Sequence, residues 1–372
     1  MKDGYRQLGD YIRPVDLRNT DGQETNLLGV SVQKKFIPSI ANTVGTDFTK
    51  YKVVKKRQFT YIPDTSRRGD KIGIALLEDY ESGIVSNIYT VFEVVDTEKL
   101  LPEYLMLWFM RPEFDRLARF KSHGSVREIF DWEQMCAVEL PVPDIEKQRK
   151  IVKAYKTITD RIALKQRIND NLEATAQAVY QSWFINFEPF GGVQPAEWKN
   201  GCVEDIAEFY DSMRKPLSSL ERADMKRLYP YYGAVSIVDY VDDYIFDGEY
   251  ILLSEDGIYV VDESGHPLIQ HIKGKFWANN HAHILKGKMP FNEDSLHLFL
   301  SNTNMATIVT GAAQPKINQA NLKSFPIMIP STEVINRFNR IIGPLYDKIL
   351  SNTLEIIRLE ELKTILITRM SL

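Results

Sequence analysis

The chain has 372 residues, enough for roughly two or three domains, and its composition is that of a folded protein. Hydrophobic residues make up 44% and charged residues 26%, which excludes disorder as the main state. The 46 basic and 50 acidic residues give a formal net charge of −4, so a nucleic-acid partner requires clustered positive charge.

No apolar run approaches the ~18 residues that a membrane-spanning helix needs, and the first residues do not resemble a signal peptide. The two cysteines, Cys136 and Cys202, are too few for a zinc cluster and indicate a reducing compartment. We therefore expect a cytoplasmic protein.

Positive charge is clustered in the first part of the chain. Eight basic residues lie between positions 50 and 71, interleaved with aromatic residues: Lys50, Lys52, Lys55, Lys56, Arg57, Arg67, Arg68 and Lys71. A second group, Arg116, Arg119, Lys121 and Arg127, flanks the loop at Gly124. Aromatic residues among basic ones favour a surface that binds phosphate. Between these groups we expect a strand over 84–95 and helical structure over 104–120, broken before Pro112.

A long helix is predicted from Asp144 to Phe184, because this range contains neither glycine nor proline and Asp144 can cap it. Its apolar face includes Ile151, Tyr155, Ile158, Ile162, Leu172 and Val179. At about 1.5 Å per residue the helix is ~60 Å long. A domain of this size cannot cover such a stripe alone, so the helix requires a long partner.

Residues 186–199, which hold Gly191 and Gly192, read as a linker to a second globular part. We expect a hairpin that turns at Asp247-Gly248, a strand over 276–285 and helical structure over 295–309. Positions 236–263 hold nine acidic and no basic residues, so we expect this stretch to face away from phosphate or toward a protein.

The second long helix begins after residue 330, and its apolar positions follow alternating four- and three-residue steps, which is typical of a coiled-coil seam. The seam includes Phe338, Leu345, Ile349, Asn352, Ile356, Leu359 and Leu366. Asn352 is the kind of polar seam residue that fixes register. Gly343-Pro344 predicts a kink that divides the helix into a short and a long piece.

The two halves of the chain repeat each other. A shift of 187 residues places Gly124–Asp131 on Gly311–Asn318 without a gap, and it places Ile151 on Phe338 and Ile162 on Ile349. The chain therefore reads as a tandem duplication, in which each copy is a globular part followed by a long helix.

Binding residues can be predicted in the second copy, whereas catalytic residues cannot. Lys273, Lys275, Asn280, Gln314 and Lys316 are the candidate DNA contacts there. Four histidines, His266, His271, His281 and His283, suggest a metal only weakly, because no cysteine or carboxylate stands at a ligand spacing. No phosphate-binding loop and no nuclease motif is present, so we expect neither catalysis nor a bound metal.

Several segments resemble one protein family, the specificity subunits of type I restriction-modification systems. The resemblance rests on Leu140–Val152 at the start of the long helix, on Tyr231–Ala234 with Tyr244–Tyr250, on Phe276–Leu285 and on the loop Gly311–Ile317. It covers essentially the whole chain in the order recognition domain, helix, recognition domain, helix.

The resemblance implies a mixed α+β fold with a pseudo-twofold internal repeat. Two tandem α/β target-recognition domains (1–143 and 201–330) would be separated by two long helices (144–185 and 331–372) that pair as an antiparallel coiled coil, with a linker over 186–200. Each domain would read one half of a bipartite DNA target, and the helices would set the spacing.

The resemblance also implies partners. Two methyltransferase (modification) subunits and two restriction/translocase subunits would assemble with the chain, and S-adenosylmethionine, ATP and Mg²⁺ would belong to those partners rather than to this chain. The alternative from another class is a coiled-coil protein scaffold without DNA binding. A self-sufficient nuclease is a third, disfavoured reading.

Overall fold

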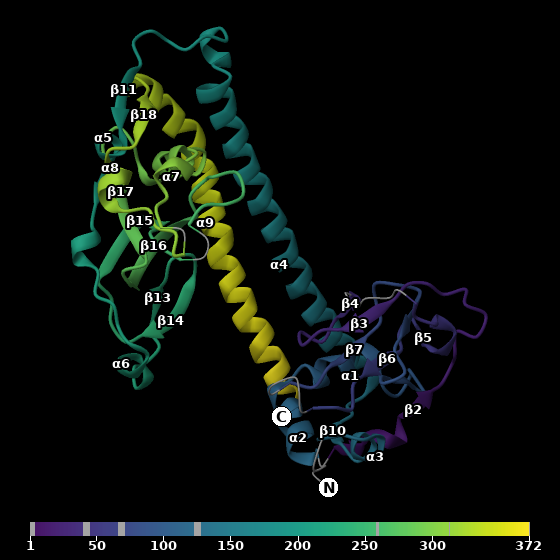
Figure 1. Ribbon diagram of the computed structural model, residues 1–372. Coiled ribbons are helices and arrows are strands. Elements are labelled where there is room, and N and C mark those ends of the chain that lie inside the picture. The colour runs from purple at the N-terminus through teal and green to yellow at the C-terminus, as the bar shows by residue number, and fades with distance from the viewer. Residues whose placement is uncertain are drawn as a thin grey trace. The chain divides into compact units, whose positions relative to one another are not determined.

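The computed structural model describes residues 4–39, 45–65, 71–122, 128–257, 260–311 and 313–371. The chain forms two compact units of mixed α and β structure (Figure 1). Unit 1 comprises Met1–Leu164 with Glu355–Leu372, and unit 2 comprises Lys165–Leu354. Within the described ranges, no helix combines the length and the hydropathy that are needed to cross a membrane.

Unit 1 is built from short antiparallel strands and three helices. The strands are β1 (Tyr5–Gln7), β2 (Ile12–Val15), β3 (Leu28–Val30), β4 (Phe36–Pro38), β5 (Lys52–Lys55), β6 (Phe59–Tyr61), β7 (Ile74–Leu76), β8 (Ser82–Val85), β9 (Thr90–Val94) and β10 (Glu139–Pro141). The largest sheet has the order β2-β9-β6-β7, and β1 pairs with β10, β3 with β4 and β5 with β8. The helices are α1 (Pro102–Phe109), α2 (Pro112–Lys121) and α3 (Trp132–Cys136).

Aromatic rings fill the core of unit 1. Phe59 on β6 stacks on Phe92 of β9 at a centroid distance of 4.8 Å, and Phe109 of α1 meets Phe59 edge-on at 5.8 Å. Met370, from the C-terminal end of the chain, is buried in the same cluster.

The break before Pro112 is confirmed by the separate helices α1 and α2. The single strand expected over 84–95 is wrong, because β8 and β9 are joined by a turn in which the Tyr89 N–H donates to the Ser86 carbonyl.

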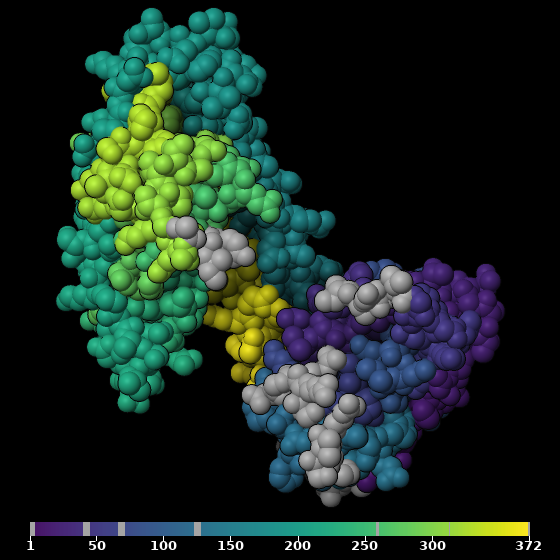
Figure 2. All heavy atoms as spheres, in the orientation of Figure 1, coloured from purple at the N-terminus to yellow at the C-terminus, as the bar shows by residue number. Residues whose placement is uncertain are grey.

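Unit 2 has one large sheet and one small sheet. The strands are β11 (Lys199–Cys202), β12 (Ala207–Phe209), β13 (Tyr229–Tyr232), β14 (Ile237–Val241), β15 (Phe246–Ser254), β16 (Ile269–Ala278), β17 (Ala282–Gly287) and β18 (Pro326–Ile329). The large sheet has the order β12-β17-β15-β16-β13-β14, in which only β13 and β16 are parallel. The helices are α5 (Val203–Ile206), α6 (Ser219–Ala223), α7 (Glu293–Ser301) and α8 (Gln319–Lys323). On the face turned to the viewer in Figure 2, the yellow-green part of the chain that follows α7 forms much of the surface of this unit.

Two expectations for the strands of unit 2 are wrong. Asp247-Gly248 does not form a turn, because Gly248 lies inside β15 opposite Gly274 of β16. Both glycines have positive φ, +133° and +113°, so they distort a continuous ribbon where an Asp-Gly turn was expected. The range 276–285 is not one strand either, because a short turn between β16 and β17 interrupts it. That turn contains neither glycine nor proline, which is why the sequence does not reveal it.

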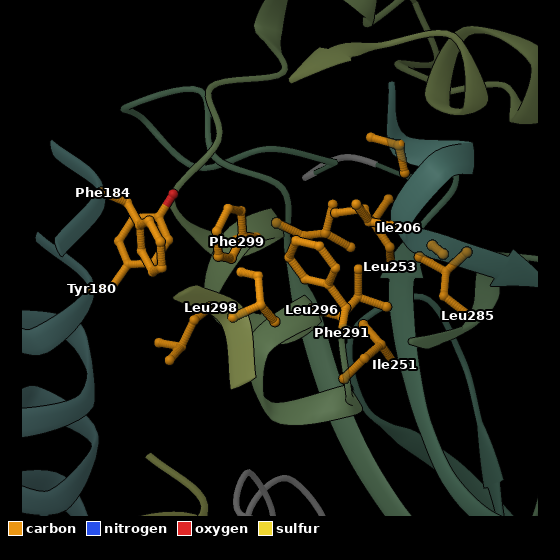
Figure 3. Close-up of a cluster of buried hydrophobic side chains, with 14 of the residues drawn as sticks. Tyr180, Phe184, Ile206, Ile251, Leu253, Leu285, Phe291, Leu296, Leu298 and Phe299 are labelled. Carbon is orange, nitrogen blue, oxygen red and sulfur yellow. The ribbon is translucent and has the colours of Figure 1, made fainter. Parts of the chain in front are cut away.

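The main core of unit 2 joins the sheet to both long helices. Ile251, Leu253 and Leu285 from the strands pack with Leu296, Leu298 and Phe299 of α7 (Figure 3). Tyr180 and Phe184 lie on the other side of Phe299, at ring distances of 5.2 and 4.7 Å. This packing attaches the end of the first long helix to the sheet.

The first long helix is confirmed as α4 (Ile145–Tyr180), which continues as a π-helical turn (Gln181–Ile185). The Asp144 carboxylate accepts a hydrogen bond from the Lys147 N–H at 2.9 Å, which is the expected N-terminal cap. The start of α4 lies in unit 1, where Ile151 and Tyr155 pack against the core. Its end lies in unit 2, where Ala176 and Tyr180 are buried.

The second long helix is α9 (Thr332–Thr368), and it contains Pro344 without a break. The expected division into a short and a long piece is therefore not observed. Proline at this position removes one backbone hydrogen bond, but the helix is held on both sides of it. Ile342 is buried in the core of unit 2, and Leu345 packs against the same core.

Side chains of α4 and α9 contact one another within each unit. In unit 1, Arg161 forms an ion pair with Glu355. In unit 2, the Asn352 amide donates to Asn169 Oδ1 at 2.8 Å, and Lys165 Nζ donates to Asn352 Oδ1 at 2.9 Å. Asn352 is fully buried, so these hydrogen bonds offset the cost of placing an amide among apolar side chains.

The residues predicted for helix pairing all avoid solvent. Every one is buried or half-buried: Ile151, Tyr155, Ile158, Ile162, Leu172, Val179, Phe338, Leu345, Ile349, Asn352, Ile356, Leu359 and Leu366. Phe338 of α9 packs on Phe184 and Trp183, in the π-helical turn that continues α4, at ring distances of 4.7 and 5.8 Å. Ile151 and Tyr155 also pack against the core of unit 1.

The two units share an order of elements. The pairing of β1 with β10 corresponds to that of β11 with β18, and the pairing of β2 with β9 to that of β12 with β17. Helices α3 and α8 lie 187 residues apart and are capped alike, by the side chains of Asp131 and Asn318. These correspondences agree with the duplication inferred from the sequence.

We predict that Phe338→Ala lowers the free energy of unfolding of unit 2 by about 3–5 kcal/mol, because it removes a fully buried ring from the core. Urea unfolding followed by tryptophan fluorescence measures this, since Trp183 and Trp198 lie in the same cluster. Ile341→Ala is the matched control on α9, because Ile341 is 44% exposed. Equal losses for the two variants would contradict the assignment of Phe338 to the core.

Candidate nucleic-acid interface

The loop Thr310–Lys316 of unit 2 projects one of the predicted DNA contacts. Its two ends bond to each other, because Thr310 N–H donates to the Lys316 carbonyl and Lys316 N–H to the Thr310 carbonyl, both at 2.8 Å. Gly311 has a φ of +86°, and a Cβ there would lie 2.4 Å from the Gln314 carbonyl oxygen. Glycine is therefore required at this position. Gln314 is exposed near the tip of the loop.

A second projecting segment is the turn between β16 and β17. Asn279 holds it, because its side-chain oxygen accepts from the His281 N–H at 2.8 Å and its own N–H donates to the Tyr232 carbonyl at 3.0 Å. Asn280 is exposed at this turn. His281 Nδ1 lies 2.5 Å from Asp256 Oδ1, which ties the turn to the segment that follows β15. His281 precedes β17 and is exposed, whereas His283 lies within β17 and is buried.

An ionic network joins the turn between β16 and β17 to the loop Thr310–Lys316. Arg214 Nη1 donates to Glu255 Oε2 at 2.5 Å and to the Ala282 carbonyl at 2.6 Å. Lys316 Nζ lies 2.9 Å from Glu255 Oε1. The Ile317 N–H donates to the Glu255 backbone carbonyl at 2.8 Å. Glu255 thus contacts both projecting segments and fixes their relative position within unit 2.

The fully buried His283 forms the other support of the loop. Its Nδ1 lies 2.6 Å from Asp211 Oδ2, and its Nε2 lies 2.8 Å from the carbonyl oxygen of Ile317. Both partners accept, so both hydrogen bonds form together only when the two ring nitrogens carry protons. Asp211 also accepts from the Ile284 N–H at 2.8 Å and from Gln319 Nε2 at 2.7 Å.

The carboxylates of this network are held in the charged form. Burial opposes ionisation of Asp211, but its hydrogen bond with His283 and the charges of His283 and Arg214 outweigh burial, so the pKa of Asp211 is lowered. Burial likewise opposes ionisation of Glu255, yet the hydrogen bonds from Arg214 and Lys316 lower its pKa. Positive side chains therefore contact both acids, and Glu255, within the acidic stretch 236–263, belongs to the support of the candidate interface.

Unit 1 holds the corresponding segments in a similar way. Asp64 bridges Ile129 as Asp256 bridges Lys316, and the Phe130 N–H donates to the Pro63 carbonyl at 2.9 Å. Arg18 Nη1 donates to Asn87 Oδ1 at 2.5 Å in the turn between β8 and β9. The Gly124 loop, including Arg127, lies outside the described residues. The backbone contacts of the segments that flank this loop, here called the frame, are thus repeated in both units. The side chains that support the frame differ.

The predicted basic residues of unit 1 fall into different environments. Lys52 is largely buried; its Nζ donates to the Tyr89 carbonyl at 2.8 Å, and burial lowers its pKa. Lys56 pairs with Glu81 at 2.5 Å and Arg57 with Glu103 at 3.1 Å. Lys50 is 74% exposed with Asp47 3.5 Å away, and Lys55 is exposed. Lys50 and Lys55 are therefore better placed for phosphate than Lys52.

The remaining predicted cations are also distributed unevenly. Arg119 contacts Glu128 at 3.2 Å, and Lys121 ends α2. Lys273 pairs with Glu249 at 3.1 Å, whereas the Lys275 ammonium lies 4.4 Å from the ring centre of Tyr244. Of the second-copy candidates, the structure brings together Asn280, Gln314 and Lys316 around the loop and the turn. Arg67 and Arg68 lie outside the described residues.

The supporting residues Asp211, Arg214, Glu255 and His283 are not identifiable from the sequence. They come from separate segments, and Asp211 and His283 are 72 positions apart. The one available signal is the unusual density of histidine near acidic residues. The side chains of Asp211, Glu255 and His283 are also close enough to share a cation, but Arg214 and Lys316 already neutralise both carboxylates.

Comparison with known proteins gives one consistent family. The model of the type I restriction modification DNA specificity domain matches twice, over residues 5–174 and 195–365. A Haemophilus influenzae protein named as type I restriction enzyme specificity subunit S.HindORF215P is 36% identical over 149 residues, which are 40% of this chain and 37% of that protein. The MjaIX specificity subunit of Methanocaldococcus jannaschii is 21% identical over 304 residues, 74% of this chain and 70% of that one.

One solved structure shares the fold over nearly the whole chain. It is a type I restriction-modification system S subunit from M. genitalium, with a TM-score of 0.59 and 12% identity over 99% of this chain and 96% of that one. The chain spans little more than a third of the length of the H. influenzae relative.

We predict that Asp211→Asn destabilises unit 2 by about 3–5 kcal/mol, because it leaves the buried His283 without its closest carboxylate partner. Urea unfolding measures the loss, and hydrogen exchange of the Ile317 N–H reports release of the loop. Asp243→Asn is the control, because Asp243 is exposed and bonds only to the neighbouring backbone.

The pH dependence of this loss follows from the lowered pKa values. The stability that Asp211 and Glu255 contribute is fully present above their unfolded pKa values, about 4, and is lost as the pH falls through the lower native values. Acid should therefore destabilise the wild type more than Asp211→Asn. An equal acid response would show that the Asp211 carboxylate does not support the loop.

Proposed function

Because the chain belongs to the family of type I restriction modification DNA specificity proteins, we propose that it is the DNA-reading subunit of a type I restriction-modification complex. Each unit contributes one recognition domain, within residues 1–143 and 201–330. Each domain reads one half of a bipartite target and thereby directs methylation and restriction by partner subunits.

The observation that carries this proposal is the repeated frame with different projecting residues. In both units, backbone bonds hold a loop at its exit, at Phe130 and at Ile317, and an arginine holds the neighbouring turn. Two copies of one frame with unlike side chains suit the reading of two unlike half-sites. A scaffold that binds proteins through its helices has no need of such loops.

Affinity and sequence choice would come from different residues. Exposed cations such as Lys50, Lys55 and Lys275 would contact phosphates, which supplies affinity without sequence preference. Asn280 and Gln314 would contact base edges, since side-chain amides offer a donor and an acceptor that match adenine in the major groove. Arg67, Arg68 and Arg127 remain candidate contacts of the first domain.

The two long helices would set the spacing between the half-sites by pairing antiparallel as a coiled coil. Support comes from the order of their contacts, because Arg161 meets Glu355, Lys165 meets Asn352, and Asn169 meets Ile349. Partner numbers thus fall along α9 as they rise along α4. A buried polar residue such as Asn352 at a seam position fixes register.

The chemistry would reside in other subunits. Two modification subunits with S-adenosylmethionine and two restriction/translocase subunits with ATP and Mg²⁺ would assemble with this chain in the cytoplasm, and this chain would contribute no catalytic residue. The competing function is a coiled-coil scaffold that does not bind DNA.

We predict that the purified chain selects, from randomised duplex DNA, two short half-sites separated by a constant gap, with an affinity that falls steeply as salt rises. Gln314→Ala should relax the preference at one base pair of one half-site, at a cost of about 1–3 kcal/mol. Gln194→Ala in the linker is the control. Failure to enrich any duplex would favour the competing function, a coiled-coil scaffold that does not bind DNA.

We also predict that a heptad inserted after Leu164 in α4, together with one after Leu354 in α9, lengthens the gap by about three base pairs. Seven helical residues add about 10.5 Å, and duplex DNA rises about 3.4 Å per base pair. The same heptad inserted between Gly191 and Gly192 is the control and should leave the gap unchanged. Altered half-sites, or an unaltered gap, would contradict the proposal that the two long helices set the spacing.

A further inference from the structure

A cluster of ligating side chains in unit 2 lies apart from the candidate interface. Glu249 on β15, His271 on β16 and Asp294 in the first turn of α7 bring their ligand atoms within 4.8 Å of one another. His271 Nε2 lies 2.8 Å from Glu249 Oε1 and 3.9 Å from Asp294 Oδ1. The three side chains are only 29%, 17% and 14% exposed, respectively, so they are largely desolvated yet reachable from solvent.

The Asp294 carboxylate lacks the partners that a buried charge normally has. The residues that the structure describes provide no hydrogen bond to it, and His271 Nε2 lies 3.9 Å from its Oδ1. Burial, together with the charge of Glu249, raises the pKa of Asp294 to about 6. A buried carboxylate without donors is costly, and a cation at this position would remove the cost.

Two neighbouring side chains pair with atoms other than the proposed ligand atoms. Lys273 pairs with Glu249 Oε2, so Oε1 remains directed at His271. His297, one turn after Asp294 on α7, has its ring centre 5.6 Å from that of His271, and its Nδ1 lies 3.2 Å from the Tyr346 hydroxyl oxygen.

We propose that Glu249, His271 and Asp294 form a binding site for a divalent transition-metal ion, for which Zn²⁺ is the best fit. One imidazole and two carboxylates are ligands that Zn²⁺ accepts, with a fourth position for water. Tetrahedral bonds of about 2.05 Å place ligand atoms about 3.4 Å apart. The observed 2.8 and 3.9 Å lie on either side of that value, so small side-chain rotations suffice.

The other group of ligating side chains does not meet these conditions. Asp211, Glu255 and His283 are close together, but Arg214 and Lys316 contact the carboxylates. Both ring nitrogens of His283 are also engaged by hydrogen-bond acceptors. A cation there would have to displace existing partners, whereas at Asp294 it would supply one that is lacking.

A metal bound at the proposed site would cross-link the sheet to α7. Glu249 and His271 belong to adjacent strands, and Asp294 belongs to the helix whose side chains Leu296, Leu298 and Phe299 form the core. The ion would therefore stabilise unit 2 without contacting the loop or the turn of the candidate interface. The inference is independent of DNA recognition.

The test uses the full chain after removal of metals with a chelator, titrated with ZnCl₂ in a calorimeter and with Co²⁺ followed by visible absorption. We expect one ion per chain and an increase in Tm when Zn²⁺ is added. Asp294→Asn and His271→Gln should each weaken binding at least about tenfold, since loss of a ligand costs no less than loss of a supporting residue.

His266→Gln is the matched control, because His266 lies on an exposed segment of unit 2 beside Asp262 and outside the cluster. It should bind Zn²⁺ as the wild type does. Absence of Zn²⁺ binding by the wild type would overturn the proposal, as would binding that persists in Asp294→Asn and His271→Gln. Circular dichroism checks that the variants fold. Selection of duplex DNA should be unchanged in them, which separates this test from that of the proposed function.

Discussion

The structure depends on one constraint, which is that a helix of 36 or 37 residues carries more apolar surface than one small domain can cover. This constraint is met because the two ends of each long helix pack in different units. The start of α4 packs on the core of unit 1 and its end on the core of unit 2. For α9 the order is reversed, with Phe338 in the core of unit 2 and Met370, two residues beyond the end of the helix, in the core of unit 1. Between the ends, the hydrogen bond of Asn352 with Asn169 supplies a partner for the buried Asn352 amide.

The same constraint explains which parts of the fold can be predicted from the sequence. The long helices have a strong signal, because apolar residues recur with helical period, Asp144 caps the first helix, and the first helix lacks glycine and proline. The duplication is evident for the same reason. Short strands carry little information each: the turn between β16 and β17 contains neither glycine nor proline, and Gly248 distorts a strand where Asp-Gly is typical of a hairpin. Pro344 was expected to divide α9, but packing on both sides holds the helix together.

The exposed loop and turn could be predicted from the sequence, whereas the contacts that support them could not. The loop and turn residues Gln314 and Asn280 are exposed as a reading surface requires. The charges were harder to interpret, because the partner of a basic residue comes from elsewhere in the chain. Lys52 is buried against the Tyr89 carbonyl, and Lys316 faces Glu255. The Asp211–His283 pair joins segments whose proximity arises only in the folded sheet.

Two main-chain hydrogen bonds close the loop at Thr310 and Lys316, and the Thr310 hydroxyl adds a third to the Lys316 carbonyl. The main-chain part of this closure has an evolutionary consequence. Any amino acid except proline can supply those two N–H groups, so the tip can mutate without loss of the frame, provided that Gly311 is retained. Selection can then change what the tip recognises in single steps that cost little stability. Such a separation between a fixed scaffold and a freely variable tip favours rapid diversification of binding preference.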